Sequence, residues 1–332
     1  MRATFDRKTD AKIWIADNES KMKRGKHIKD AEAKKHTLAD LIDRYIEFEI
    51  PQRKSDQEKF KMQLEWWKNK IGAFLLSDIT PSLLSQYKDV LGNEPSPKPK
   101  NGKTTRSNAT INRYMACLSI VFTKAVREWE WMEENPMFKV TKKKEPKGRV
   151  RFLTDKEKKN LLLECEKISK ELYLLVKIAL TTGARYGEIT GLKWQDIDFE
   201  NRMFHFIDTK NGEDRGVSIF SDVLNDLTTF SKIRNIKSDY VFIRPDGEKL
   251  IYFRNKFDDA VENAKIKNFH FHDLRHTAAS YLAMNGASSL EIAEILGHKT
   301  LAMVKRYSHL TRNHTAEILE RMNEKQFREI LK

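Results

Sequence analysis

Apolar residues recur at helical spacing through the first half of the chain. The segment after Thr37, a residue that favours a helix N-cap, carries five of them three or four positions apart: Leu38, Leu41, Ile42, Tyr45 and Ile46. The same spacing predicts further helices over 56–71, 81–91 and 108–129, with Pro81 at a first helical position. Four prolines and glycines between 93 and 107 predict a loop there. Residues 37–138 are therefore expected to form a separate all-α four-helix domain.

The second half is also mainly helical, but it contains one alternating stretch. "RMFHFID" and "GVSIF" alternate apolar and polar residues on either side of the turn residues "KNG", which predicts a β-hairpin. Thr154 with Glu157 forms a capping-box pattern that starts a helix, and Gly183 ends the next one. Further helices are predicted over 222–233, 254–264, 272–284, 289–296, 301–307 and 315–330. Residues 152–332 are thus expected to form an α+β domain, mainly α with a small antiparallel β-sheet.

Two shorter segments flank the four-helix region. Residues 1–35 hold one weakly amphipathic helix, over 8–24, which is too small to stand alone and is interpreted as an appendage. Residues 139–151, "KVTKKKEPKGRVR", contain seven Lys or Arg against one acid, together with Pro146 and Gly148. Such a basic, helix-breaking segment predicts an exposed interdomain linker that could follow a phosphate backbone or serve only as a solvated tether.

The charge of the chain narrows the class of partner. Its 332 residues include 62 Lys and Arg against 48 Asp and Glu, which gives a formal net charge of +14. A basic surface binds polyanions by releasing their condensed counterions, so nucleic acid is the expected partner. No apolar run reaches the roughly 18 residues of a membrane span, and the charged N-terminus does not resemble a signal peptide. An intracellular protein without a membrane segment is expected.

The two cysteines point away from disulfide and zinc chemistry. Cys117 and Cys165 lie far apart in apolar, helical patterns and lack the paired spacing of a structural zinc site. Histidines are bunched in "HFHDLRH", where a zinc ion could be considered, but Arg275 would repel a cation and no carboxylate cluster lies nearby. A metal-dependent phosphoesterase is therefore the weaker alternative, and no metal or cofactor is expected.

Residues suited to phosphate chemistry follow one another on successive predicted elements. Each of them can hold, protonate or attack a phosphate: Arg185, Lys210, His272, Arg275, His298 and Tyr307. Arg185 stands at the start of a helix, and His272 and Arg275 share one helical face. Singly, each residue is more simply a surface or core residue, and only the combination favours a catalytic site.

The motifs that carry these residues resemble those of the tyrosine recombinases of the phage-integrase family. "ARYGEITGLKW", the His-x-x-Arg box "HDLR" and "LGH" nine residues before Tyr307 match the catalytic domain over about 151–310, and 37–138 is similar to the helical, SAM-like core-binding domain. Val304 stands where the family often has threonine. The segment 1–35 resembles only the last helix of the family's arm-binding domain, without the small sheet before it, so recognition of arm sites is not predicted.

The resemblance implies a role for each residue. Tyr307 would be the nucleophile that forms a 3′-phosphotyrosyl intermediate, with Arg185 and Arg275 stabilising the transition state. His272 would be the base, His298 a donor to a phosphate oxygen and Lys210 the acid for the departing 5′-oxygen. Glu188 would orient the site. Because bond energy is conserved in the covalent link, no ATP is required.

The resemblance also implies partners. Double-stranded DNA at attachment sites would be held between the two domains, and two groups of residues are candidates for contacting it: Lys142, Lys143, Lys144, Lys147, Arg149 and Arg151 of the linker, and Lys103, Arg106, Asn108 and Arg113 of the helical domain. A homotetramer joined through the C-terminal tail, accessory bending or directionality proteins, and action in the cytoplasm at the nucleoid of a bacterial host are further expectations. Two alternatives stay open, a type IB topoisomerase and a DNA-binding regulator that has lost catalysis.

Overall fold

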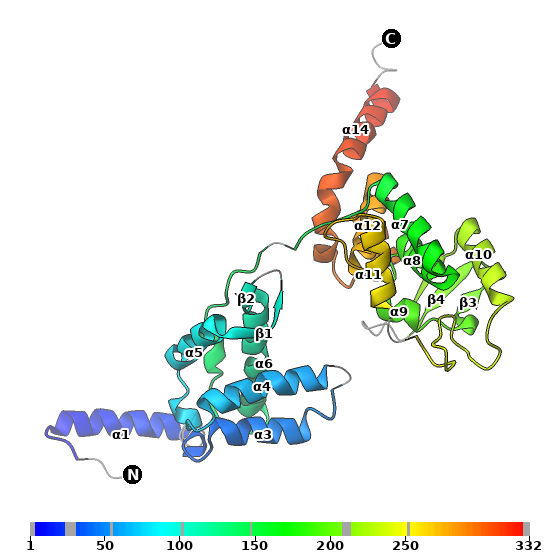
Figure 1. The fold of residues 1–332 in the computed structure, drawn as a ribbon. Helices are drawn as coiled ribbons and strands as arrows, with labels where there is room; N and C mark the ends of the chain where they lie inside the picture. Colours follow the sequence, from blue (N-terminus) through cyan, green and yellow to red (C-terminus); the bar gives the residue numbers. More distant parts are fainter. Residues whose placement is uncertain are drawn as a thin grey trace. The chain divides into compact units, whose positions relative to one another are not determined.

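The computed structural model describes residues 4–23, 31–53, 56–100, 103–146, 148–207, 214–250 and 253–327 (Figure 1). The chain divides into two compact units, Met1–Lys147 and Gly148–Lys332. Each unit has its own hydrophobic core. The mainly α fold with small antiparallel sheets agrees with the expected fold class.

The first unit is built mainly from α-helices in the part of it that the structure describes. Their bounds are α1 Lys8–Lys23, α3 Leu38–Phe48, α4 Gln57–Ile71, α5 Pro81–Asn93 and α6 Asn108–Arg127, with short 3-10 helices at Leu76–Asp78 and Pro136–Lys139. Thr37 and Asp40 form a reciprocal capping box at the start of α3, and Thr80 caps α5. Trp67, fully buried, donates its indole N–H to the Tyr114 carbonyl at 3.0 Å, which fastens α4 to α6.

The prediction of a loop over 93–107 was wrong. β1 (Pro95–Lys100) and β2 (Lys103–Thr105) pair as an antiparallel hairpin, with Pro95 opposite Thr105 and Lys100 opposite Lys103. In the described ranges β1 has no second neighbour, so its prolines, which lack an N–H donor, need not donate on the open side. The first unit is consequently not purely α.

In the described ranges, the second unit combines helices with one small sheet. Its elements are α7 Asp155–Ile168, α8 Lys170–Thr182, α9 Tyr186–Thr190, α10 Ser221–Ser231, α11 Arg254–Asn263, α12 His272–Met284, α13 Ser289–Leu296 and α14 Arg312–Phe327. The strands β3 (Ile197–Asp198), β4 (Met203–Phe206) and β5 (Arg215–Ser218) form one antiparallel sheet in that order, so a short third strand joins the predicted hairpin. None of the helices in the described parts of the chain combines the length and apolar character that crossing a membrane requires.

The chain around Tyr307 does not form the α-helix predicted over 301–307. Two 3-10 helices, Leu301–Met303 and Lys305–Thr311, take its place. Val304 and Tyr307, three residues apart, are both buried against Ala279, Ala283 and Leu296. Val304 is the residue between the two 3-10 helices and Tyr307 lies in the second, so the turn between them directs both side chains into the same core.

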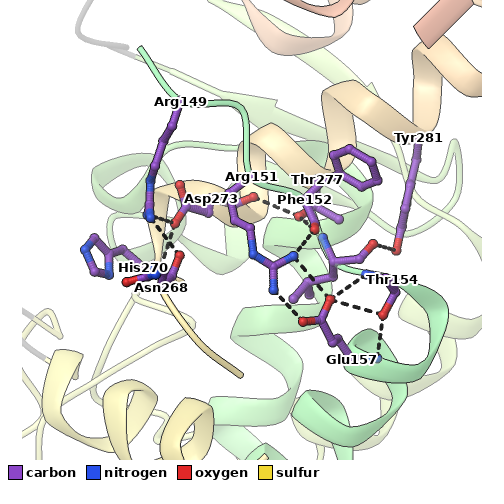
Figure 2. Close-up of polar contacts among 11 residues, drawn as sticks. Arg149, Arg151, Phe152, Thr154, Glu157, Asn268, His270, Asp273, Thr277 and Tyr281 are labelled. Carbon is purple, nitrogen blue, oxygen red and sulfur yellow. Dashed lines mark hydrogen bonds and ion pairs between the residues drawn. The ribbon is translucent and has the colours of Figure 1, made fainter. Parts of the chain in front are cut away.

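The basic segment 139–151 is held at both ends rather than solvated throughout. In the first unit, Asn112 and Lys143 exchange two hydrogen bonds of 2.8 and 2.9 Å, and Asn112 also donates to Glu145 at 2.7 Å. In the second unit, Arg149 donates to the Asn268 carbonyl at 2.7 Å and to the Asp273 carboxylate at 2.5 Å (Figure 2). The length of chain between these two attachments is therefore short.

Candidate functional site

Arg185 is positioned by a sharp connection between α8 and α9. Gly183 ends α8 with a φ of 62°, and a Cβ at this position would lie 2.1 Å from the Leu296 side chain. Only glycine fits both the left-handed conformation and this close approach. Arg185 follows as the N-cap residue of α9 and donates to the Gly297 carbonyl at 2.9 Å. The start of α9 and the end of α13 are thereby joined through one guanidinium.

Glu188 binds two arginines at once. Its carboxylate accepts from the Arg185 guanidinium at 2.6 Å, from the Arg185 backbone N–H at 2.8 Å and from the Arg215 guanidinium at 2.8 Å. Burial raises the pKa of Glu188, but the Arg185 backbone N–H and the two arginines outweigh it and leave the pKa below the usual value. The ionised carboxylate therefore orients both guanidiniums.

Sequence reasoning missed Arg215. It begins β5, has a largely buried side chain, and also donates to the Ile295 carbonyl. The predicted return strand was read from Gly216 onward, and nothing in the alternation marks the residue before it. Its position 27 residues after Glu188 becomes meaningful only through the pairing of β4 with β5.

Arg275 contributes the third guanidinium of the site. It is only 5% exposed, and one of its terminal nitrogens donates to the Gly183 carbonyl at 2.8 Å, whereas Nη2 is buried and has no hydrogen-bond partner among the described residues. Burial lowers the pKa of Arg275 to about 9, and repulsion from Arg185 and Arg215 adds to the effect. Three guanidiniums around one carboxylate leave a net positive charge and an unused donor, which together suit an oxyanion.

His298 lies next to this cluster. It follows Gly297, which ends α13 with a φ of 63°, and its Nδ1 is buried without a partner in the described part of the chain. Burial, reinforced by Arg275 and Arg185, lowers the pKa of His298 to about 4. The imidazole is therefore neutral at neutral pH and retains one N–H that can donate to a phosphate oxygen.

Tyr307 lies in the same unit, 2% exposed, with its hydroxyl 2.5 Å from His276 Nδ1. Burial raises the pKa of Tyr307, while Arg306 and Arg275 act against this shift. His276 was considered above only as part of a histidine cluster, so this contact was not predicted. His272, the expected base, is exposed, and its ring centre lies 5.2 Å from that of His276.

The structure thus brings six of the seven predicted catalytic residues into one unit. Lys210, the seventh, lies outside the described residues. A pocket of about 430 Å³ adjoins Arg185 and Glu188 and is also lined by His205 and Lys249. In the ranges that the structure describes, no three His, Cys, Asp or Glu side chains are grouped to hold a metal ion.

The residues expected to contact DNA differ in their exposure and in whether they are already bonded to other residues. Lys142, Lys144 and Arg113 are exposed or half-exposed, and Arg149 is half-exposed but bonded to Asp273. Lys143 pairs with Asp89 at 2.6 Å, and the Asn108 side chain donates to the Lys144 carbonyl at 2.8 Å.

Two of these arginines form ion pairs within their own units. Arg106 is largely buried and bonds to Glu94 at 3.2 Å and to the Leu91 carbonyl at 3.1 Å. Arg151 pairs with Glu157 of the α7 capping box (Figure 2). Lys147 and the Lys103 side chain fall outside the described part of the chain.

Comparison with known proteins covers both units. Residues 151–314 match the model of the phage integrase family, and residues 37–143 match that of the phage integrase SAM-like domain. The chain is 31% identical over 278 residues to a shufflon-specific DNA recombinase of Escherichia coli, covering 83% of this chain and 70% of that protein. It is 32% identical to the integrase of Salmonella phage P22, covering 63% of this chain and only 56% of that protein.

Solved structures share the fold at low sequence identity. A Tn1549 transposon integrase in complex with transposon right end DNA has a TM-score of 0.69 at 17% identity and covers 85% of this chain and 99% of that one. A lambda integrase dimer bound to a COC′ core site has a TM-score of 0.64 at 20% identity and covers 80% of this chain and 97% of that one.

Proposed function

Because the chain belongs to the phage integrase family of tyrosine recombinases, we propose that Tyr307 is the nucleophile with which it cleaves DNA. The protein is a site-specific recombinase of the phage or mobile-element type, an enzyme that breaks and rejoins DNA strands. The observation that supports the assignment is that Tyr307, a group able to form a covalent phosphate ester, lies in the same unit as Arg275. Arg275 has an unused buried donor, and its positive charge acts to lower the pKa of Tyr307.

The proposed first step is an in-line displacement at the scissile phosphate. The bond from the Tyr307 oxygen to phosphorus forms, and the bond from phosphorus to the 5′-oxygen breaks. The 5′-hydroxyl of a partner strand then reverses these changes, so the enzyme needs neither ATP nor another cofactor. Lys210 supplies the proton to the departing 5′-oxygen and takes it back in the reverse step.

The arginines stabilise the charge that develops on the phosphate. Arg275 directs its free Nη2 to one nonbridging oxygen, and Arg185 contacts the other, while neutral His298 donates an additional hydrogen bond. Glu188 and Arg215 do not react. Glu188 holds Arg185 in place and is itself bonded to Arg215, so that the donors are oriented before DNA arrives.

DNA binding is proposed to involve both units. The two solved integrases described above are DNA complexes, and Lys142, Lys144 and Arg113 offer accessible charge on this chain. We also propose a homotetramer on DNA joined through α14, which Figure 1 shows projecting from its unit and on which Leu319 and Met322 are 53% and 44% exposed. Accessory DNA-bending or directionality proteins and action at the nucleoid in the cytoplasm of a bacterial host belong to the same proposal.

A nicked suicide duplex tests the assignment of the nucleophile. The ends of the element that encodes the chain supply the sequence, and the nick lets the cleaved fragment diffuse away. We expect a covalent protein–DNA adduct from the wild type and none from Tyr307→Phe, with noncovalent DNA binding retained. An adduct that persists in Tyr307→Phe would refute the assignment. Strand exchange between two duplexes, rather than relaxation of one, distinguishes a recombinase from a type IB topoisomerase.

A further inference from the structure

His276 is in contact with the atom that is proposed to attack the phosphate. It lies on α12, one helical turn after His272, and its Nδ1 is 2.5 Å from the Tyr307 hydroxyl oxygen. The two residues are 31 positions apart, so the contact depends on the packing of the 3-10 helix Lys305–Thr311 against α12. No other hydrogen bond of the Tyr307 hydroxyl is found among the described residues.

The surroundings of His276 favour its neutral form before DNA binds. Burial lowers its pKa to about 4, and the neighbouring His272 and the positive charges of Arg306 and Arg275 add to the effect, while Asp273 opposes it. A neutral imidazole that faces a phenol accepts the hydroxyl proton at Nδ1 and carries its own hydrogen on Nε2. The phenol is protonated as well, because burial raises the pKa of Tyr307.

His272 is less well placed for the same task. It lies at the exposed start of α12, and in the described contacts it does not bond to the Tyr307 hydroxyl. Burial of part of the ring and the neighbouring Arg275 lower the pKa of His272, so it is also neutral. Both histidines could accept a proton, but only His276 is already hydrogen-bonded to the group that must lose one.

We propose that His276, rather than His272, accepts the phenolic proton of Tyr307 as its oxygen attacks phosphorus. The proposal rests on the proposed function of Tyr307. The proton moves from the Tyr307 oxygen to His276 Nδ1, the oxygen–phosphorus bond forms, and the 5′-oxygen leaves with a proton from Lys210. In the reverse step the His276 imidazolium returns its proton to the Tyr307 oxygen as the phosphotyrosyl bond breaks.

The charge of the substrate explains why transfer waits for DNA. An imidazolium at His276 is disfavoured while the guanidiniums of Arg275 and Arg306 act on it and Asp273 opposes them. A bound phosphodiester supplies a negative charge to this cluster and so raises the pKa of His276 toward its ordinary value. The base is therefore strengthened only when the scissile phosphate occupies the site.

The test uses His276→Asn, because the Asn amide can keep the hydrogen bond at the position of Nδ1 but cannot take up the proton. We expect the rate of adduct formation on the suicide duplex to fall by about 10²- to 10⁴-fold. Replacement of Tyr307 by 3-fluorotyrosine, whose hydroxyl is more acidic, should reduce that deficit severalfold, since a weaker base then suffices. An equal deficit with both phenols would show that His276 only positions Tyr307 and would overturn the proposal.

The pH dependence offers a second readout on a different variant. The wild-type cleavage rate should fall at acid pH as the base becomes protonated. In His272→Asn this acid limb should remain if His276 is the base and should vanish if His272 is the base. An acid limb lost in His272→Asn overturns the proposal even where His276→Asn fails to fold. Absence of an adduct from the wild type would instead contradict the proposed function itself.

Discussion

The two units differ in the partners of their buried polar groups. In the first unit, Asn112 is bonded on both sides of its amide, and Arg53, whose Nε lacks a hydrogen bond, lies over the Phe60 ring at 3.9 Å. In the described part of the second unit, Arg275 Nη2 and His298 Nδ1 are buried without partners beside other cations. A buried unpaired polar atom costs roughly 1 to 3 kcal/mol, and Arg275 Nη2 and His298 Nδ1 are two that a bound anion could satisfy. The contrast separates a unit organised for stability from one organised to receive an anion.

The largest expected effect comes from removing the unpaired donor. Arg275→Met should lower the rate of adduct formation by about 10²- to 10³-fold, because the transition-state charge loses a preorganised donor. The melting temperature should stay unchanged or rise, since a desolvated cation leaves the core. Suicide-substrate kinetics and thermal unfolding on the same preparation measure both quantities. A large fall in stability would show that Arg275 is a structural residue and would remove the contrast.

Glu188→Gln should give the next largest change, in stability. The variant leaves Arg185 and Arg215 facing each other without a carboxylate, and we expect a loss of about 2 to 4 kcal/mol at pH 7. The pKa of Glu188 is below its usual value of 4.5, so its contribution is present above that pH and disappears as the pH falls through the lowered pKa. Thermal unfolding of both proteins should therefore differ most at neutral pH and converge in acid.

Arg106→Met tests the first unit in the same way. Arg106 is 8% exposed in its side chain and bonded to Glu94 and Leu91, so its removal should cost about 1 to 3 kcal/mol of stability. Arg113→Met, on an exposed position of α6, is the matched control and should cost less than about 0.5 kcal/mol. Denaturant unfolding measures both variants. Equal losses of stability in the two variants would mean that the hydrogen bonds of Arg106 do not stabilise this unit.

The smallest change is expected in the salt dependence of DNA binding. Lys142→Ala and Lys144→Ala each remove one accessible cation, so the slope of log K against log salt should fall by about 0.9 for each phosphate that is no longer neutralised. Arg151→Ala should leave the slope unchanged, because Arg151 is paired with Glu157. Titrations between about 50 and 200 mM salt compare them. A reduced slope for Arg151→Ala would mean that DNA displaces Glu157.

Local patterns were sufficient where neighbours along the chain decide the outcome. The capping box of Thr154 with Glu157 and the helix end at Gly183 are present as the sequence indicated. Arg215 and His276 were missed because their partners, Glu188 and Tyr307, lie 27 and 31 residues away and are brought close only by tertiary packing. The β1–β2 hairpin was missed because its prolines argue against a strand unless that strand is an open edge.

The hydrogen bonds at both ends of the basic segment leave only a short length of free chain between the two units. Between Glu145, bonded to Asn112, and Arg149, bonded to Asp273, the chain has four Cα–Cα steps, which span at most about 15 Å. In the proposed DNA complex, a tether of this length gives the second unit an effective concentration on the order of millimolar once the first has bound. Two weak DNA-binding surfaces can then act as one strong one, and lengthening this short tether should weaken binding to a complete site more than binding by either unit alone.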